Sequence, residues 1–137
     1  MTAADIQLTR HFRLAEFLNL TRYPDNVPDA QSLTNLQYGV ATILEPVRLL
    51  LNAPIIINSG YRNPHVNEAV GGVANSQHLT GCAADIRCSD RSKFNVLLAH
   101  LRSTDYDQLL VGNGWCHISW NPHAAPRRMY RPRYYSY

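Results

Sequence analysis

The stretch that decides the fold and the site is Ser76–Asp85, which reads SQHLTGCAAD and places a histidine and an aspartate seven residues apart. Gly81 allows a sharp turn between these two side chains. A second histidine, His117, comes late in the chain, in the segment WCHISW. Two imidazoles and one carboxylate suffice to bind a catalytic zinc ion and leave its fourth position open for water. The sequence therefore predicts a zinc site at His78, Asp85 and His117, which cobalt or manganese would also suit.

The ligands are expected on two strands of one sheet. Residues 83–87 are predicted to form a strand, in which alternation points Asp85 to the face opposite Ala84 and Ile86. Residues 106–120 predict a hairpin, because Asn-Gly at its centre is the strongest short turn signal. Bringing His117 to the other ligands requires the hairpin to lie beside the first strand.

The whole pattern predicts an α+β fold with a small antiparallel sheet and two main flanking helices. Residues 30–51 are the clearest helix, since apolar side chains recur every three or four positions, and Pro46 is expected to kink or divide it. Asp29 or Ser32 would cap its start. The other expected elements are, in chain order, a short strand or turn into a short helix within 6–20, a buried strand over 54–58, a loop over 63–75 and a second helix after Ser89 or Asp90.

Length and composition favour one domain. The chain has 137 residues, of which 45% are hydrophobic, so we expect a single domain over 1–137 and a monomer. No apolar run is long enough to span a bilayer. The N-terminus lacks a basic region followed by an apolar one, so no signal peptide is expected.

The formal net charge is +3, and four of the 13 basic residues cluster near the C-terminus. Arginine interleaved with tyrosine can bind nucleic acid or an anionic polymer. The alternative is a solvated tail, or a strand that packs its tyrosines on the domain. We favour the alternative, and expect no nucleic-acid partner, because the charges are few. This tail, residues 126–137, contains Arg127, Arg128, Tyr130, Arg131, Arg133, Tyr134, Tyr135 and Tyr137.

Three cysteines, Cys82, Cys88 and Cys116, cannot all pair with one another. Their spacing is not that of a Cys-x-x-Cys zinc framework. If the segments of Cys82 and Cys116 are adjacent, they would form a disulfide or a close thiol contact. Small buried free thiols are the favoured interpretation.

The motif Ser-x-His-x-x-Gly-x-Ala-x-Asp, followed by a distant Trp-x-His, resembles the M15 zinc peptidases, the group of D-Ala-D-Ala carboxypeptidases and phage endolysins. Upstream, Ser59–Arg62 matches the family's Ser-Gly-Tyr-Arg, and Val66–Gly72 matches the stretch that leads to the zinc motif. The resemblance is closest to the small single-domain branch and covers most of the chain. It implies a hedgehog/DD-peptidase-like zinc peptidase fold.

The resemblance also implies an activity, the hydrolysis of amide bonds in peptidoglycan stem peptides. The bond would be a terminal D-Ala-D-Ala bond or an L-Ala–D-Glu-type bond. Arg62 would bind the developing oxyanion or orient the peptide, and Ser76 would hydrogen-bond the substrate or a metal ligand. Small size and the missing signal peptide favour a phage or prophage enzyme, made in the cytoplasm and acting at the cell wall in lysis or entry.

The general base is the part of the family pattern from which this chain departs. Many members have a glutamate three residues before the last histidine, where this chain has Gly114. An acidic pair that follows a Gln-Leu-Ile segment in the small-domain branch is replaced by Val111 and Gly112. Asp107 is the remaining nearby acid, either the base or a strand-start carboxylate. Two alternatives to an active peptidase follow: a weak or inactive zinc-containing module that binds the cell wall, and, from the tail alone, a phage structural or nucleic-acid-associated protein.

Overall fold

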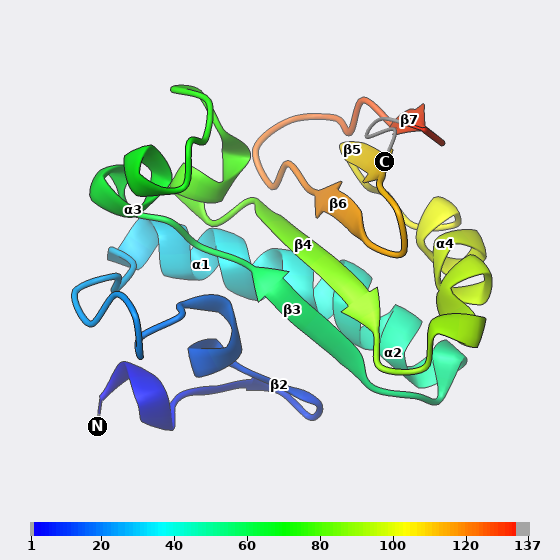
Figure 1. Ribbon diagram of the computed structural model, residues 1–137, viewed down its shortest axis with the longest axis horizontal. Coiled ribbons are helices and arrows are strands. Elements are labelled where there is room, and N and C mark those ends of the chain that lie inside the picture. The colour runs from blue at the N-terminus through cyan, green and yellow to red at the C-terminus, as the bar shows by residue number, and fades with distance from the viewer. Residues whose placement is uncertain (1, 134–137) are drawn as a thin grey trace.

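A computed structural model describes residues 2–133 and contains a five-stranded sheet with helices packed against it (Figure 1). Neighbouring strands are antiparallel except at one edge, where β5 and β7 are parallel. The α+β prediction with a small antiparallel sheet is confirmed, and the parallel edge strand is an addition to it. The strands, in their order across the sheet, are β3 (Ile55–Ser59), β4 (Ala83–Cys88), β6 (Cys116–Ser119), β5 (Gln108–Val111) and β7 (Met129–Arg131).

The long predicted helix is one continuous helical run that lies behind β3 and β4 in Figure 1. It consists of α1 (Ala30–Gly39), a π-helical turn (Val40–Leu44) and α2 (Glu45–Leu51). A carboxylate oxygen of Asp29 accepts a hydrogen bond from the Ser32 backbone, which confirms Asp29 as the N-cap. Pro46 lacks an N–H and clashes with the carbonyl four residues earlier. The predicted division therefore takes the form of a wider π turn just before the proline.

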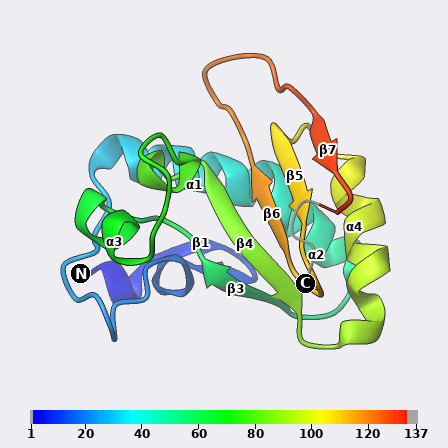
Figure 2. The same cartoon turned by 45° about the horizontal axis from the view of Figure 1, so that its top comes forward.

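The second predicted helix is α4 (Phe94–Arg102), preceded by a short 3-10 turn (Arg91–Lys93). The Asp90 carboxylate accepts a hydrogen bond from the Ser92 backbone N–H and so caps this turn. Leu97 and Leu101 are fully buried on its inner face. Figure 2 shows α4 beside β5 and β7, away from the N-terminal part of the chain.

The predicted loop over 63–75 is wrong in its first half, because residues Pro64–Ala69 form the helix α3. The Asn63 side chain accepts a hydrogen bond from the Val66 backbone N–H, and Pro64 occupies the first helical turn. Both are favourable helix-start residues. Residues 70–75 remain a loop, which leads directly into the zinc motif.

The N-terminal part contains two short strands, β1 (Gln7–Thr9) and β2 (Phe12–Arg13), and a 3-10 helix (Leu14–Phe17). A hydrogen bond from the Tyr61 backbone N–H to the Phe17 carbonyl joins this part to the segment after β3. Another short 3-10 helix (Ala3–Asp5) precedes the strands. These elements match the predicted short strand and short helix within residues 6–20.

Trp120 ties the end of β6 to the helical layer. Its side chain is fully buried, and its Nε1 donates to the carbonyls of Asn35 at 2.9 Å and Gly81 at 3.2 Å. A Cβ atom at Gly39 would overlap the indole ring, so α1 approaches this closely only because residue 39 has no side chain. The strand that carries His117 is thereby fixed against both α1 and the turn after His78.

The described part of the C-terminal tail packs on the protein as a strand. Tyr130 in β7 packs against the core, and the guanidinium of Arg102 lies 4.2 Å from the centre of its ring. This agrees with the favoured interpretation of the tail, of which Tyr134, Tyr135 and Tyr137 lie outside the described residues. Within residues 2–133, no helix has both the length and the apolar character needed to cross a membrane.

All three cysteines are free and buried, as favoured from the sequence, and none is in a disulfide. Burial is the main cause that raises the pKa of each thiol above its ordinary value. The thiols are therefore protonated at neutral pH and belong to the core.

Candidate metal centre

The pairing of β4 with β6 brings two of the predicted ligands together. In the register of this pair, Asp85 lies directly opposite His117. The His117 Nδ1 atom is 2.9 Å from Oδ1 of Asp85. Alternation along each strand sends Ala84 and Ile118 into the core instead. The predicted neighbour relation of the two strands is confirmed.

His78 reaches the same carboxylate from a 3-10 helix (Gln77–Thr80) that precedes β4. Ser76 caps this turn, since its hydroxyl oxygen accepts a hydrogen bond from the His78 backbone N–H at 3.2 Å. Gly81 ends the turn in the left-handed region, with φ of +74°, which favours glycine. A Cβ there would also clash with the Ser32 carbonyl oxygen. The glycine of the motif therefore serves both the turn and the close contact with α1.

The imidazole of His78 is held by a second contact on its far side. Its Nδ1 lies 2.6 Å from the carbonyl oxygen of Gly60, and its side chain is only 4% exposed. A carbonyl oxygen can only accept, so Nδ1 carries the proton of this hydrogen bond and Nε2 is the nitrogen that faces the site. Nε2 is 3.3 Å from Oδ1 of Asp85. Such backing of an imidazole by a carbonyl is usual for histidines that bind metals.

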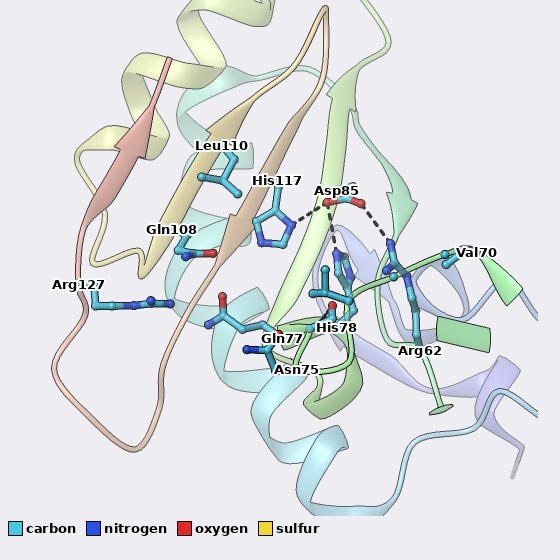
Figure 3. A pocket seen from close by; sticks show the side chains of 14 residues that line it. Arg62, Val70, Asn75, Gln77, His78, Asp85, Gln108, Leu110, His117 and Arg127 are labelled. Atoms are coloured by element: carbon cyan, nitrogen blue, oxygen red, sulfur yellow. Dashed lines mark hydrogen bonds and ion pairs between the residues drawn. The ribbon is translucent and has the colours of Figure 1, made fainter. Parts of the chain in front are cut away.

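The three side chains fit the donor set of a zinc ion. One ligand atom from each of His78, Asp85 and His117 can be chosen so that all lie within 4.8 Å of one another (Figure 3). Burial raises the pKa of Asp85, but hydrogen bonds from His117 and His78 outweigh it and hold this pKa well below its ordinary value. The carboxylate is therefore ionised at neutral pH, which is the form that binds a metal.

Arg62 lies on the other side of the same carboxylate. Its Nη2 is 3.5 Å from Oδ2 of Asp85, so the two oxygens of Asp85 face different partners. Nε donates to the Ser59 hydroxyl at 3.0 Å, and Nη1 donates to Oδ1 of Asn67 at 3.3 Å. The Asn67 amide also donates to the Val73 carbonyl, which links Arg62 to the loop beside the site. The guanidinium is thus oriented on three sides.

A cavity of about 500 Å³ opens over this cluster. It brings together the three predicted metal ligands and both predicted substrate-binding residues, Arg62 and Ser76. Polar side chains from the loop before the motif and from the strands complete its wall. The lining residues are Arg62, Val70, Gly71, Gly72, Val73, Asn75, Ser76, Gln77, His78, Asp85, Gln108, Leu110, His117 and Arg127.

Asp107, the residue considered as general base, is not among these lining residues. It is 1% exposed and accepts hydrogen bonds from the backbone and the guanidinium of Arg127, and one from Gln77 at 3.0 Å. The hydrogen bonds from Arg127 are the main cause that lowers the pKa of Asp107. A carboxylate so engaged is a poor proton acceptor, so its surroundings favour the structural alternative.

Three lining or supporting residues had no predicted role, namely Asn67, Gln77 and Arg127. The family-like stretch before the motif contains Asn67, but only the structure shows that it connects Arg62 to the loop. Gln77 and Arg127 meet through Asp107, from segments 50 residues apart in the sequence. No local pattern indicates such a contact.

Comparison with known proteins agrees with this geometry. A sequence model of the family Peptidase M15 matches residues 10–119, which include all three candidate ligands and Arg62. A comparison with curated proteins gives no match. Because the family match spans most of the chain, this protein belongs to the M15 peptidases.

Proposed function

We propose that the protein is a zinc-dependent peptidase that hydrolyses amide bonds in peptidoglycan stem peptides. The observation that carries the proposal is the convergence of His78, Asp85 and His117 in the cavity of an M15 peptidase. When bound, zinc would supply a Lewis acid that acidifies water and polarises the scissile carbonyl. These three side chains would hold it.

The chain's own residues would bind and orient the peptide. Arg62 reaches the cavity beside Asp85, and its fork of N–H donors suits a peptide carbonyl or carboxylate. Ser76 lines the cavity and its hydroxyl caps the turn of His78, so Ser76 would act on both the substrate and the metal ligand. The Gly60 carbonyl would keep Nε2 of His78 aimed at the metal.

A second candidate is a zinc-containing wall-binding module with weak or no hydrolysis. One observation favours it: among the described residues that line the cavity, Asp85 is the only carboxylate. That carboxylate is already engaged by both histidines. A separate general base is therefore not evident, and turnover decides between the two candidates.

We further propose a single domain that acts as a monomer at the bacterial cell wall, in phage lysis or entry. The proposed partner is the peptide of peptidoglycan rather than nucleic acid. Support for this choice comes from the tail, where the guanidinium of Arg128 is engaged by the carbonyls of Thr104 and Arg102.

The test combines metal content with peptide release. Purified wild type, His78→Ala, Asp85→Ala and His117→Ala would be loaded with zinc, dialysed and analysed for bound metal. Each would then be incubated with purified peptidoglycan, and the released peptides identified by mass spectrometry. His65→Ala is the matched control, because His65 is exposed on α3.

One equivalent of zinc in the wild type and the control, with loss in the three ligand variants, is the expected result. Peptide release that follows the same pattern supports the peptidase. Zinc binding without release from peptidoglycan would favour the wall-binding module. Wild type that retains no zinc would refute the proposed site.

A further inference from the structure

We infer that Arg127 binds a carboxylate of the peptide substrate, at the end of the cavity opposite Arg62. The inference rests on the proposed function and adds a specificity-determining residue to it. Arg127 lies beyond residues 10–119, the part of the chain that matches the family. It therefore belongs to this chain's own C-terminal segment.

Arg127 is held in one orientation by a buried carboxylate. Its backbone N–H donates to Oδ1 of Asp107 at 2.9 Å, Nε lies 3.1 Å from both oxygens, and Nη2 lies 2.6 Å from Oδ2. Asp107 is 1% exposed and is also fixed by Gln77. A guanidinium group that is already held along one edge loses little conformational entropy when its other edge binds a ligand.

The free edge of this fork is the one available to a substrate. Within residues 2–133, Nη1 of Arg127 makes no hydrogen bond or ion pair, and the side chain is 53% exposed. Nη1 carries two N–H donors, which suit a carboxylate oxygen. Arg127 also lines the cavity.

The position of Arg127 separates its ligand from that of Arg62. In Figure 3, Arg127 lies on the side of Gln108 and Gln77, whereas Arg62 lies on the side of Val70, with His117 and Asp85 between them. A peptide that crosses the candidate metal centre would thus meet one guanidinium on each side. Two arginines and one aspartate are the lining residues with a fixed charge, so the cavity favours an anionic peptide.

The next residue, Arg128, also anchors the C-terminal segment. Arg128 donates to the carbonyls of Thr104 and Arg102, and its guanidinium lies 5.1 Å from the centre of the Tyr106 ring. Arg128 does not line the cavity. Arg128→Gln is therefore a matched control that removes one charge and one anchor but leaves the cavity wall intact.

The test uses the synthetic pentapeptide L-Ala-γ-D-Glu-L-Lys-D-Ala-D-Ala, which has two carboxylates, and two analogues in which one or the other is a carboxamide. The kcat/KM of the zinc-loaded wild type, Arg127→Gln and Arg128→Gln would be measured on all three. At one of the two positions, amidation should lower the wild-type value about tenfold or more, as expected for a charge-assisted contact. Arg127→Gln should remove that difference, and Arg128→Gln should keep it.

Thermal unfolding of each variant reports whether it is folded. If Arg127→Gln does not fold, Arg127→Lys replaces it; this variant keeps the charge and loses the fork, and should retain only part of the preference. A wild type that cleaves all three peptides equally would overturn the inference and leave the peptidase intact. The same holds if Arg127→Gln keeps every preference that the wild type shows.

If the wild type cleaves none of the peptides, the proposed peptidase activity fails on its own. Calorimetric titration of the zinc-loaded proteins with the same three peptides then decides the inference. Weaker binding of one amide, abolished in Arg127→Gln and kept in Arg128→Gln, supports it. Equal binding of all three peptides, or no binding, overturns it.

Discussion

Replacing Asp107 by asparagine tests which of two roles this residue has, the structural role of holding Arg127 or the catalytic role of a general base. The substitution would place an amide group among donors, because Arg127 and Gln77 both donate to this side chain in the wild type. The carboxylate is buried, whereas Arg127 is half exposed and can be solvated after the change. If Asp107 is an anchor, the main effect of Asp107→Asn is therefore a loss of stability.

The size of that loss follows from the number and kind of contacts. Breaking a fully buried ion pair costs about 3–5 kcal/mol, and exposure of the partner guanidinium lowers this to roughly 2–3 kcal/mol. A chain of 137 residues that unfolds in one step has an unfolding entropy of roughly 0.29 kcal/mol/K, from about 2.1 cal/mol/K per residue. The midpoint of thermal unfolding should therefore fall by roughly 7–10 °C.

Circular dichroism during heating in a chelating buffer would measure this change without a contribution from metal. Asp105→Asn is the matched control, because Asp105 is 87% exposed and pairs with Arg128 at 3.6 Å. Asp105→Asn should lower the free energy of unfolding by less than about 0.5 kcal/mol.

The stability that Asp107 contributes depends on pH. The pKa of Asp107 is lowered in the folded protein, so this contribution to stability is complete above the unfolded pKa, about 4, and is lost as pH falls through the folded pKa. The difference between wild type and Asp107→Asn should therefore shrink below about pH 4.

The result that would refute this reasoning is an Asp107→Asn protein as stable as the wild type with kcat lowered by a factor of about 100 or more, the order expected for a lost general base. Asp107 would then be a proton acceptor and not an anchor. If Asp107→Asn is less stable than the wild type and has lost the same substrate preference as Arg127→Gln, the role of Asp107 as an anchor is confirmed.

Three further predictions concern the metal, the core and the thiols. Zinc at about 100 times its dissociation constant should stabilise the wild type by about 2.7 kcal/mol through binding and so raise its unfolding midpoint by roughly 9 °C. The unfolding midpoints of the three ligand-to-alanine variants should not change with zinc, whereas His65→Ala should show the same rise as the wild type. Gly39→Ala should lower the free energy of unfolding by at least about 2 kcal/mol in denaturant titrations, because the overlap with Trp120 exceeds the gain of roughly 1 kcal/mol in helix propensity; an unchanged midpoint would contradict the packing. The native thiols should react with a thiol reagent at about pH 8 at least about tenfold more slowly than thiols in unfolded protein, and rapid reaction of any cysteine would mean that it is accessible.

Local patterns in the sequence were sufficient for the strands that carry two of the candidate ligands, Asp85 and His117. The zinc motif, the alternation around Asp85 and the Asn-Gly hairpin predicted β4, β5 and β6, and their register brings His117 to Asp85. The helix α3 was missed because its six residues show no apolar period, although Asn63 and Pro64 are start signals.

The remaining features depend on contacts between distant segments. The strand β7 has three residues and forms by pairing with β5, so its own sequence carries little signal. The roles of Gln77 and Arg127 depend on the orientation of the Asp107 carboxylate, and hydrogen bonds from Gln77 and Arg127 together fix this orientation. Such three-body contacts have no period or spacing along the chain.

The position of β6 between β4 and β5 has a consequence for the order of folding. The hairpin of β5 and β6 joins nearby residues, and hairpins form within about 1–10 μs. Pairing of β6 with β4 joins residues about 30 positions apart and must first close a longer loop. His117 reaches Asp85 only in this docking step. Zinc capture during refolding should therefore report the docking of β6 on β4, later than the signals of secondary structure.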